Sequence, residues 1–234
     1  MELLARLAEE PRRAAIVLDI DGTLAPIVPR PADARIPDAT LRELARLAGR
    51  YALVACISGR AEADAQRLVG LAQVVVVGNH GLELDPDAGS WRTRLAAFLA
   101  HEPRPAEDKG LTAAFHFRGA ADERAARDEL EQIAARARAA GFETRYGRKV
   151  LEILPPLPAN KGSAVLRLTA ERGLTRALYA GDDTTDLDAF RALERLELGV
   201  RVAVVSAEAP AGLAEAADLV VAGPDELREL LRTL

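Results

Sequence analysis

Runs of consecutive apolar residues alternate with segments of helical periodicity along most of the chain. Apolar runs rich in Val, Ile and Ala predict buried strands at residues 14–18, 52–57, 74–77, 177–180, 202–205 and 219–222. Between them, apolar positions three or four residues apart predict helices at residues 38–49, 61–70, 161–173, 186–196, 209–217 and from 224 onward. Continuous apolar strands that alternate with helices are typical of a mostly parallel α/β sheet covered on both faces.

The segment from about residue 85 to residue 158 has a different pattern. It predicts the order helix, strand, helix, strand, strand, at residues 90–101, 111–118, 122–140, 142–146 and 150–154. The last two strands are joined by a short Gly-Arg-Lys turn, which favours an antiparallel hairpin. We therefore expect a small inserted α+β domain at residues 86–157, within a core domain made of residues 1–85 and 158–234.

Composition narrows the class of protein. The chain has 234 residues, of which 49% are hydrophobic and 29% charged, as in soluble globular proteins. The net charge of -5 and the lack of a dense basic tract argue against nucleic acid as a partner. No apolar stretch approaches the ~18 residues of a membrane span, and the N-terminal segment lacks the apolar core of a signal peptide. Cys56, the one cysteine, cannot form an internal disulfide. We expect a monomer in the cytoplasm that interacts with no membrane.

The first candidate site follows the strand at residues 14–18. Asp19 and Asp21 come directly after this apolar run and are followed by a Gly-Thr turn. A carboxylate at a strand end can act as a covalent nucleophile toward phosphorus, and a second one nearby can transfer protons. A calcium loop would need a Glu at its twelfth position, which is Arg30 here, so this alternative is excluded.

Three further signals lie at the ends of strands or the starts of helices. Ser58 and Gly59 offer a hydroxyl and accessible backbone N–H groups to a phosphoryl oxygen. Lys161 opens a helix, where its charge would neutralise a phosphate. After the strand at 177–180 comes an acidic cluster, whose oxygen ligands favour Mg²⁺: Asp182, Asp183, Asp186 and Asp188. Taken singly, a Ser-Gly turn also fits an ordinary helix start, and a lone lysine also fits the surface.

In combination these motifs resemble the haloacid-dehalogenase-like (HAD) phosphohydrolase superfamily. The matching strings are DIDGT, SGR, the helix-opening Lys and GDDTTD. The resemblance implies a doubly wound, Rossmann-like core with an inserted cap of the C2 type, in which Asp19 is the nucleophile and Asp21 the general acid/base. It also implies that Ser58, Gly59 and Lys161 bind the phosphoryl group.

The same resemblance implies a Mg²⁺ site. Its ligands would be Asp19, Asp182 and the backbone carbonyl of Asp21, with Asp183 and Asp186 in or near the second layer around the metal.

A narrower resemblance is to the trehalose-6-phosphate phosphatase family. It rests on the strings GNHGLEL, EDK, FHFR, GRKVLEILP and GDDTTDLDAF, the last of which has Leu187 where the family usually has an acid. The resemblance implies that residues of the cap bind the sugar. Matched by motif, and with Arg60 added from SGR, the substrate-binding set is Arg60, Glu107, Lys109, Arg118 and Glu152. His80 and His116 favour structural roles, and Lys149 has no assigned role.

We therefore expect a Mg²⁺-dependent phosphatase that hydrolyses trehalose 6-phosphate to trehalose and phosphate through an aspartyl-phosphate. Three alternatives stay open. The substrate could be another sugar phosphate, such as sucrose phosphate or a glucosyl- or mannosyl-glycerate phosphate. The enzyme could be a sugar phosphomutase. A non-catalytic sensor phosphorylated on Asp19 is disfavoured by the acid/base Asp21 and by the large insert.

Overall fold

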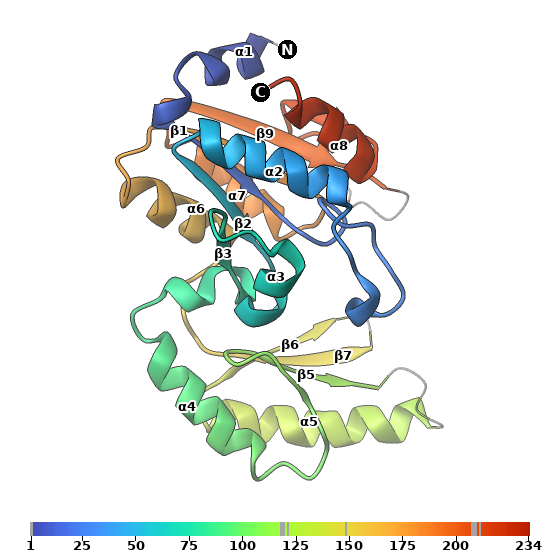
Figure 1. Ribbon diagram of the computed structural model, residues 1–234. Helices are drawn as coiled ribbons and strands as arrows, with labels where there is room; N and C mark the ends of the chain where they lie inside the picture. Colours follow the sequence, from blue (N-terminus) through green and yellow to red (C-terminus); the bar gives the residue numbers. More distant parts are fainter. Residues whose placement is uncertain (1, 118–119, 121, 148, 207–209, 211) are drawn as a thin grey trace. The chain divides into compact units, whose positions relative to one another are not determined.

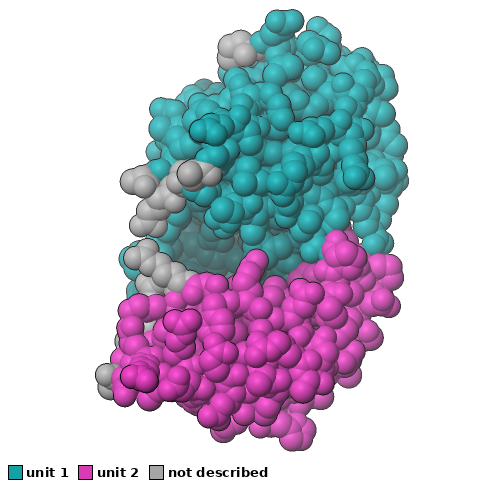
Figure 2. Space-filling model, turned by 180° about the vertical axis from the view of Figure 1, so that it is seen from behind, with its two compact units in different colours: residues 1–81, 159–234 teal, residues 82–158 magenta. Residues whose placement is uncertain are grey.

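The chain folds into two compact units. The computed structural model describes residues 2–117, 120, 122–147, 149–206, 210 and 212–234. Unit 1 comprises Met1–Gly81 and Ala159–Leu234, and unit 2 comprises Leu82–Pro158 (Figure 2). Arg118, expected to bind the sugar, lies outside the described residues.

The sheet of unit 1 is entirely parallel. Its strand order is β10-β9-β8-β1-β2-β3 (Figure 1). The strands are β1 (Ala14–Leu18), β2 (Leu53–Ile57), β3 (Val75–Val77), β8 (Arg176–Gly181), β9 (Leu198–Val204) and β10 (Leu219–Val221). Nearly every residue of β1, β2 and β8 is buried, which explains why these strands read as continuous apolar runs.

Helices cover both faces of this sheet. They are α1 (Glu2–Glu9), α2 (Asp38–Arg50), α3 (Glu62–Val69), α6 (Lys161–Ala170), α7 (Asp186–Leu193) and α8 (Gly223–Leu231), with short 3₁₀ turns η1 (Pro11–Arg13), η2 (Pro31–Asp33) and η3 (Asn79–Leu84). Ile16 of β1 shares a core with Leu44 of α2 and Leu227 of α8. Tyr179 of β8 instead meets Phe190 of α7 edge to face, with ring centroids 6.2 Å apart. The doubly wound α/β core expected from the sequence is confirmed.

Unit 2 is an antiparallel sheet with two helices on one face. Its strands are β4 (Glu107–Asp108), β5 (Ala113–His116), β6 (Glu143–Gly147) and β7 (Val150–Leu154), in the order β4-β5-β7-β6. The helices are α4 (Ala88–Leu99) and α5 (Glu123–Ala139), and α5 begins at the N-cap Asp122. Phe115, Leu151 and Ile153 pack against Leu130 and Ile133 of α5. This confirms the inserted α+β unit.

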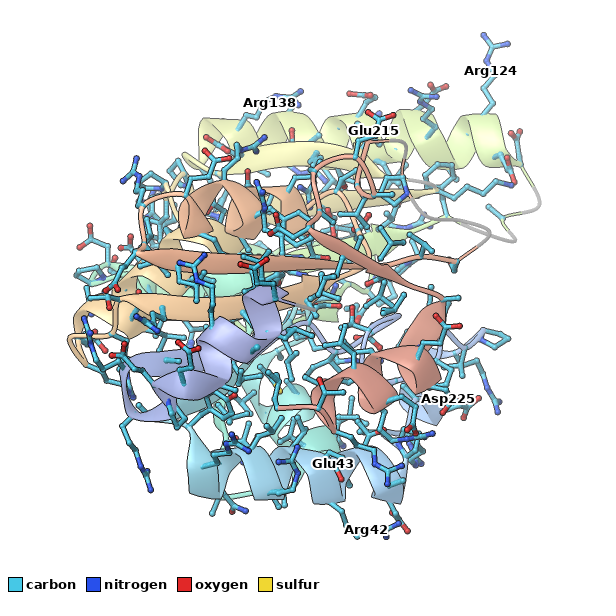
Figure 3. All side chains as sticks on the ribbon, turned by 90° about the horizontal axis from the view of Figure 1, so that it is seen from above. Arg42, Glu43, Arg124, Arg138, Glu215 and Asp225 are labelled. Carbon is cyan, nitrogen blue, oxygen red and sulfur yellow. The ribbon has the colours of Figure 1, made fainter. Side chains whose placement is uncertain are left out.

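Charged side chains cover the outer helix faces of each unit. Arg42 of α2 and Arg124 of α5 both point into solvent, away from the sheet that their own helix covers (Figure 3). None of the described helices is long and apolar enough to cross a membrane.

One predicted element is wrong. The helix expected at residues 209–217 is not formed by the described part of that segment, in which residues 212–216 make a turn. Pro210 and Gly212, which has φ of +88°, are poor helix residues and outweigh the alanines around them. The structure also adds α1 and β4, which the sequence pattern did not predict, and β9 begins at Leu198 rather than at residue 202.

Candidate active site

The register of three neighbouring strands brings the core motifs to one edge of the unit 1 sheet. Leu18 of β1 pairs with Ala180 of β8 on one side and with Cys56 of β2 on the other. All three strands are parallel, so the residues that follow them emerge at the same edge. Asp19, Ser58 and Asp182 therefore come from adjacent strand ends.

Lys161 joins this edge from a helix start. Asn160 caps α6 and forms a reciprocal capping box with Ser163, which fixes the first turn of the helix. The Lys161 ammonium donates to Oδ1 of Asp19 at 2.7 Å and to Oδ1 of Asp186 at 2.6 Å. The Lys161 side chain is only 3% exposed, and Asp19 and Asp186 are also buried. Lys161 thus bridges two acids that lie far apart in the sequence.

Asp186 organises the loop after β8. Its Oδ1 accepts from Lys161 and from the Tyr179 hydroxyl, the latter at 2.6 Å. Its Oδ2 accepts the backbone N–H groups of Asp182 and Asp183 at 3.0 and 2.9 Å. Four donors thus converge on one carboxylate, which has about four lone-pair sites. Asp186 therefore holds the loop and Lys161 in place.

Asp182 lies against the turn that follows β1. The hydroxyl of Thr23 donates to Asp182 Oδ1 at 3.2 Å. Gly22 has φ of +83°, and a Cβ there would lie 2.0 Å from Asp182 Oδ2. Only glycine meets both conditions, the left-handed backbone and the close approach. The Asp-Gly-Thr turn is therefore shaped around the Asp182 carboxylate.

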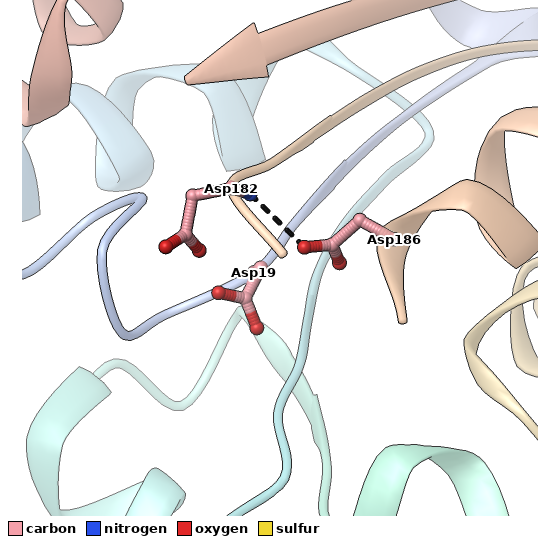
Figure 4. Close-up of side chains that lie close together, drawn as sticks. All are labelled: Asp19, Asp182 and Asp186. Atoms are coloured by element: carbon pink, nitrogen blue, oxygen red, sulfur yellow. Dashed lines mark hydrogen bonds between the residues drawn. The ribbon is translucent and has the colours of Figure 1, made fainter. Parts of the chain in front are cut away.

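The acidic cluster fits a divalent cation. One carboxylate oxygen from each of Asp19, Asp182 and Asp186 lies within 4.8 Å of the others (Figure 4). Three carboxylates face one ammonium, so the cluster carries excess negative charge in a buried place. An oxygen-only donor set with such an excess suits Mg²⁺ or a similar hard cation. Asp186 already accepts four hydrogen bonds, so Asp19 and Asp182 are the better placed ligands.

The pKa values of these groups reflect the same excess charge. Burial raises the pKa of Asp19 well above its usual range, against the opposing effect of Lys161. Burial and the charge of Asp186 raise the pKa of Asp182 to about 6. Burial alone would lower the pKa of Lys161, but the charges of Asp19 and Asp186 outweigh it and raise that pKa. The lysine is therefore a permanent cation, and both candidate ligands gain from a further positive charge.

Two other acids of the cluster after β8, Asp183 and Asp188, have different partners. Asp183 is exposed, and its carboxylate caps the Thr184 N–H at 2.7 Å rather than joining the cluster. Asp188 pairs with Arg191 on α7. Adjacent acids in the GDDTTD string thus have different partners, because the tight turn after β8 sends successive side chains in different directions.

The second carboxylate of the DIDGT string, Asp21, pairs with Arg60. Nε of Arg60 donates to Oδ2 of Asp21 at 2.7 Å, and Nη2 donates to Oδ1 at 2.6 Å. Ser58, which is 1% exposed, accepts the Arg60 N–H on its hydroxyl at 3.2 Å. The SGR string therefore connects the end of β2 to the loop after β1.

Candidate sugar-reading residues lie in unit 2. Glu107 pairs with Ala114, Ala114 with Glu152, and Glu152 with Arg145, so these positions form one cross-strand row. Because directly paired residues share a face, the row lies on the face opposite the apolar core. His116 contacts Oε2 of Glu107 at 2.8 Å, and Arg145 donates to Oε2 of Glu152 at 2.7 Å.

Sequence reasoning missed three of these contacts. It assigned no role to the Tyr179 hydroxyl, to the hydroxyl of Thr23 or to Arg145. A tyrosine in an otherwise aliphatic buried strand was the available signal for Tyr179, because a buried hydroxyl needs a partner. Lys149, also unassigned, has φ of +63° and an ion pair with Glu123 at the surface of unit 2.

The chain is similar to known proteins in sequence and in structure. The trehalose-phosphatase family model matches residues 17–104 and 105–220. Trehalose-phosphate phosphatase of Mycobacterium avium is 35% identical over 209 residues, which cover 78% of this chain and 52% of that protein. A Mycobacterium tuberculosis protein described as an uncharacterized glycosyl hydrolase is 33% identical over 219 residues, 82% of this chain and 16% of that protein. The chain thus spans about half, or less, of the length of these relatives.

Solved structures give a consistent result over almost the whole chain. The crystal structure of a trehalose-6-phosphate phosphatase related protein has a TM-score of 0.69 and 27% identity, and covers 94% of this chain and 96% of that one. Trehalose-6-phosphate phosphatase of Aspergillus fumigatus has a TM-score of 0.63 and 25% identity, with 99% and 96% covered. The family model matches well over half of the residues, in agreement with the parallel core and the inserted antiparallel unit. This chain therefore belongs to the trehalose-phosphatase family of the HAD superfamily.

Proposed function

We propose that this chain is a Mg²⁺-dependent phosphatase that hydrolyses trehalose 6-phosphate to trehalose and inorganic phosphate. The observation that carries the proposal is the buried cluster in which Lys161 bridges Asp19 and Asp186 beside Asp182. Burying charges is costly where they are not balanced, and here three carboxylates share one ammonium. A dianionic phosphoryl group and a divalent cation together match the lysine and the carboxylates.

Asp19 is the proposed nucleophile. Lys161 holds Oδ1 of Asp19, which fixes the carboxylate and leaves Oδ2 to attack phosphorus. A bond forms between Oδ2 and phosphorus while the bond from phosphorus to the sugar oxygen breaks, giving an aspartyl-phosphate. Lys161 and the hydroxyl of Ser58 bind the phosphoryl oxygens as negative charge shifts among them. The N–H groups of the turn at Gly59 add further donors.

Asp21 is the proposed proton carrier. Its proton goes to the departing sugar oxygen, which would otherwise leave as an alkoxide. The resulting carboxylate then takes a proton from a water molecule, whose oxygen attacks phosphorus and releases phosphate from Asp19. The cycle restores a protonated Asp21 and a free Asp19 carboxylate.

Asp19 and Asp182 would hold the cation, together with the backbone carbonyl of Asp21. When bound, Mg²⁺ would supply positive charge that stabilises the phosphoryl group in the transition state. Asp186 supports this site indirectly, because it fixes the backbone of Asp182 and the ammonium of Lys161.

Sugar recognition is assigned to unit 2. We place Glu107, Lys109, Arg118 and Glu152 in contact with sugar hydroxyls, because charged groups form strong hydrogen bonds with such partners. Support comes from the cross-strand row that places Glu107 and Glu152 on the same face of the sheet.

A panel of phosphate esters tests the proposal. We would measure phosphate release from trehalose 6-phosphate, sucrose 6-phosphate, glucosyl- and mannosyl-glycerate phosphates and glucose 6-phosphate, with Mg²⁺ and with EDTA. The proposal predicts the highest kcat/KM for trehalose 6-phosphate and a loss of turnover in EDTA. A higher kcat/KM for another ester would show that the proposed substrate is wrong and that the proposed reaction, phosphate ester hydrolysis, is right. Isomerised sugar phosphate without phosphate release would indicate a phosphomutase, and no turnover of any ester would contradict the phosphatase.

A further inference from the structure

Every nitrogen of the Arg60 guanidinium has a partner in unit 1. Nε and Nη2 donate to the two carboxylate oxygens of Asp21, and Nη1 donates to the backbone carbonyl of Pro31 at 3.1 Å. A two-pronged pair of this kind fixes the plane of a carboxylate as well as its distance. Arg60 therefore connects Asp21 with Pro31, the first residue of η2, and sets the orientation of the Asp21 carboxylate.

The backbone of Arg60 is held as firmly as its side chain. The N–H of Asn79 donates to the Arg60 carbonyl at 2.8 Å, and the N–H of His80 donates to the Ser58 carbonyl at 2.8 Å. Asn79 and His80 adopt φ of +48° and +56°, a region that non-glycine residues rarely occupy. Such strain persists only where the surrounding structure imposes it, and it is common next to functional sites. The segment after β3 thus fixes the point from which the Arg60 side chain extends.

The pair leaves part of Asp21 accessible. The Asp21 side chain is 41% exposed and that of Arg60 is 16% exposed. A carboxylate has about four lone-pair sites, and the guanidinium takes two of them. The remaining two lie on the edges turned away from Arg60. The Arg60 guanidinium has five N–H groups, and Asp21 and Pro31 accept from three of them, one on each nitrogen.

We propose that Arg60 is a positioning residue that acts on the reaction through Asp21 and not through direct contact with the substrate. Arg60 fixes the orientation of the Asp21 carboxylate, so that its exposed edge meets the departing oxygen in the geometry needed for proton transfer. The inference rests on the proposed role of Asp21 as the proton carrier. It differs from the sequence-based expectation, which placed Arg60 among the substrate-binding residues.

A series of aryl phosphates with leaving groups of graded acidity tests this role without depending on the sugar. Arg60→Met removes the guanidinium, and Arg67→Met on α3 is the matched control, because Arg67 pairs with Asp64 at the exposed surface. We expect Arg60→Met to lower kcat about 10- to 100-fold for phenyl phosphate, part of the ~10²–10⁴-fold that general acids supply. For 4-nitrophenyl phosphate, whose leaving group scarcely needs a proton, the loss should be under about threefold.

The mechanism of the loss is tested by a double-mutant cycle. If Arg60 acts through Asp21, Arg60→Met should have little further effect in an Asp21→Asn background. The inhibition constant of inorganic phosphate should be unchanged, because Arg60 does not bind the phosphoryl group. Arg60→Lys keeps a charge but not the planar fork, so it should resemble Arg60→Met. If Arg60→Met does not fold, Arg60→Gln replaces it in the same cycle.

Several outcomes would overturn the inference. It is overturned if the two losses add in the cycle, or if Arg60→Lys restores full activity. It is also overturned if Arg60→Met raises the inhibition constant of phosphate and leaves the leaving-group dependence unchanged, or if Arg60→Met has the same kcat as Arg67→Met. If Asp21→Asn itself loses the same factor on all esters, the proposed proton carrier is wrong and the inference is overturned with it. If the loss of kcat depends on the leaving group in Asp21→Asn but not in the Arg60 variants, Asp21 keeps its role as proton carrier and only the role of Arg60 is overturned.

Discussion

Unit 1 and unit 2 both gather charged side chains, but they hold them in different ways. In unit 1, Lys161 and its partners Asp19 and Asp186 are almost fully buried and come from three separate elements. In unit 2, His116 contacts Glu107, and Arg145 contacts Glu152, between neighbouring strands, and these side chains are 25–57% exposed. The buried group cannot rearrange without leaving charges unpaired, whereas exposed pairs exchange partners at little cost.

This difference suggests a division of labour. A phosphoryl group and a metal present the same charges in every substrate, so a rigid, buried arrangement serves all of them. Sugar hydroxyls differ from one substrate to the next, and in the proposed function they would be bound by the less buried side chains of unit 2. Substitutions of the residues that bind the phosphoryl group or the metal should therefore affect all phosphate esters, and substitutions of Glu107 and Glu152 should affect only those with the right sugar.

The largest expected effect is that of Asp19→Asn. An amide is not a competent nucleophile and is a weaker metal ligand, so turnover of every ester should fall below detection. Phosphate release from trehalose 6-phosphate and from 4-nitrophenyl phosphate measures this. Asp64→Asn, an exposed acid on α3, is the control and should retain full activity. Turnover by a clean Asp19→Asn preparation would remove Asp19 from the mechanism.

Asp21→Asn should have the next largest effect. Loss of the proton donor should lower kcat on trehalose 6-phosphate by about 10²–10⁴-fold while substrate still binds. The factor should be much smaller on 4-nitrophenyl phosphate, and comparing kcat for the two esters checks it. Equal losses on both would mean that Asp21 does not protonate the leaving group.

Glu152→Ala sharpens the contrast between the units. A hydrogen bond between a charged group and a sugar hydroxyl contributes ~1.5–3 kcal/mol. Its removal should therefore lower kcat/KM for trehalose 6-phosphate by about 10- to 150-fold. Lys109→Ala should behave similarly. Kinetics on 4-nitrophenyl phosphate should change little, and Asp128→Ala serves as the control, because Asp128 is an exposed acid on α5, which covers the other face of the sheet. A comparable loss on both esters would break the proposed division between the units.

Tyr179→Phe tests how far the buried network depends on one hydroxyl. Asp186 would lose its 2.6 Å donor, and the free energy of unfolding should fall by about 1–3 kcal/mol. Denaturant unfolding measures this change. Tyr51 is a matched control: its buried hydroxyl has no hydrogen-bond partner among the described residues, so Tyr51→Phe should be neutral or stabilising. A stability loss no larger for Tyr179→Phe than for Tyr51→Phe would contradict the role given to Tyr179.

Asp182→Asn should give the smallest effect, and one of opposite sign. The pKa of Asp182 is raised from 3.8 to about 6, so the folded chain binds more protons than the unfolded chain in this range. The contribution of Asp182 to the free energy of unfolding therefore falls as pH rises from about 4 to about 6. At pH 7 without metal, Asp182→Asn should stabilise the protein by roughly 1–2 kcal/mol.

Thermal unfolding at pH 5 and pH 7, in EDTA and in Mg²⁺, measures this contribution. The gain from Asp182→Asn should vanish in Mg²⁺, which stabilises the wild type through its binding. Asp183→Asn, the exposed neighbour, should keep the pH dependence of the wild type. A lower melting temperature for Asp182→Asn at pH 7 in EDTA would contradict the excess charge assigned to the cluster.

The sequence predicted the parts of the fold that depend on local pattern. Continuous apolar runs identified β1, β2 and β8, and strand ends located Asp19, Ser58 and Asp182. The prediction of a helix at residues 209–217 was wrong, because the alanines there favour a helix less strongly than Pro210 and Gly212 oppose it. The two-residue strand β4 carries too little pattern to be recognised.

Partner choice within the site could not be predicted. The string GDDTTD does not show that Asp186 turns inward to Lys161 while Asp183 caps Thr184, because this depends on the backbone of the turn. Likewise, nothing local connects Arg60 with Asp21, which are brought together by the pairing of β1 with β2. Motifs thus predicted which residues gather, and tertiary structure decides which of them touch.

The central claim is that Asp19 carries the phosphoryl group during hydrolysis. The stereochemical course at phosphorus tests it most directly, with a phosphorothioate ester whose two non-bridging oxygens are different isotopes, hydrolysed in water that carries the third oxygen isotope. Each in-line displacement inverts phosphorus, so attack by Asp19 followed by attack of water predicts net retention in the released thiophosphate. Net inversion would show that water attacks the substrate in a single step, and would contradict the account.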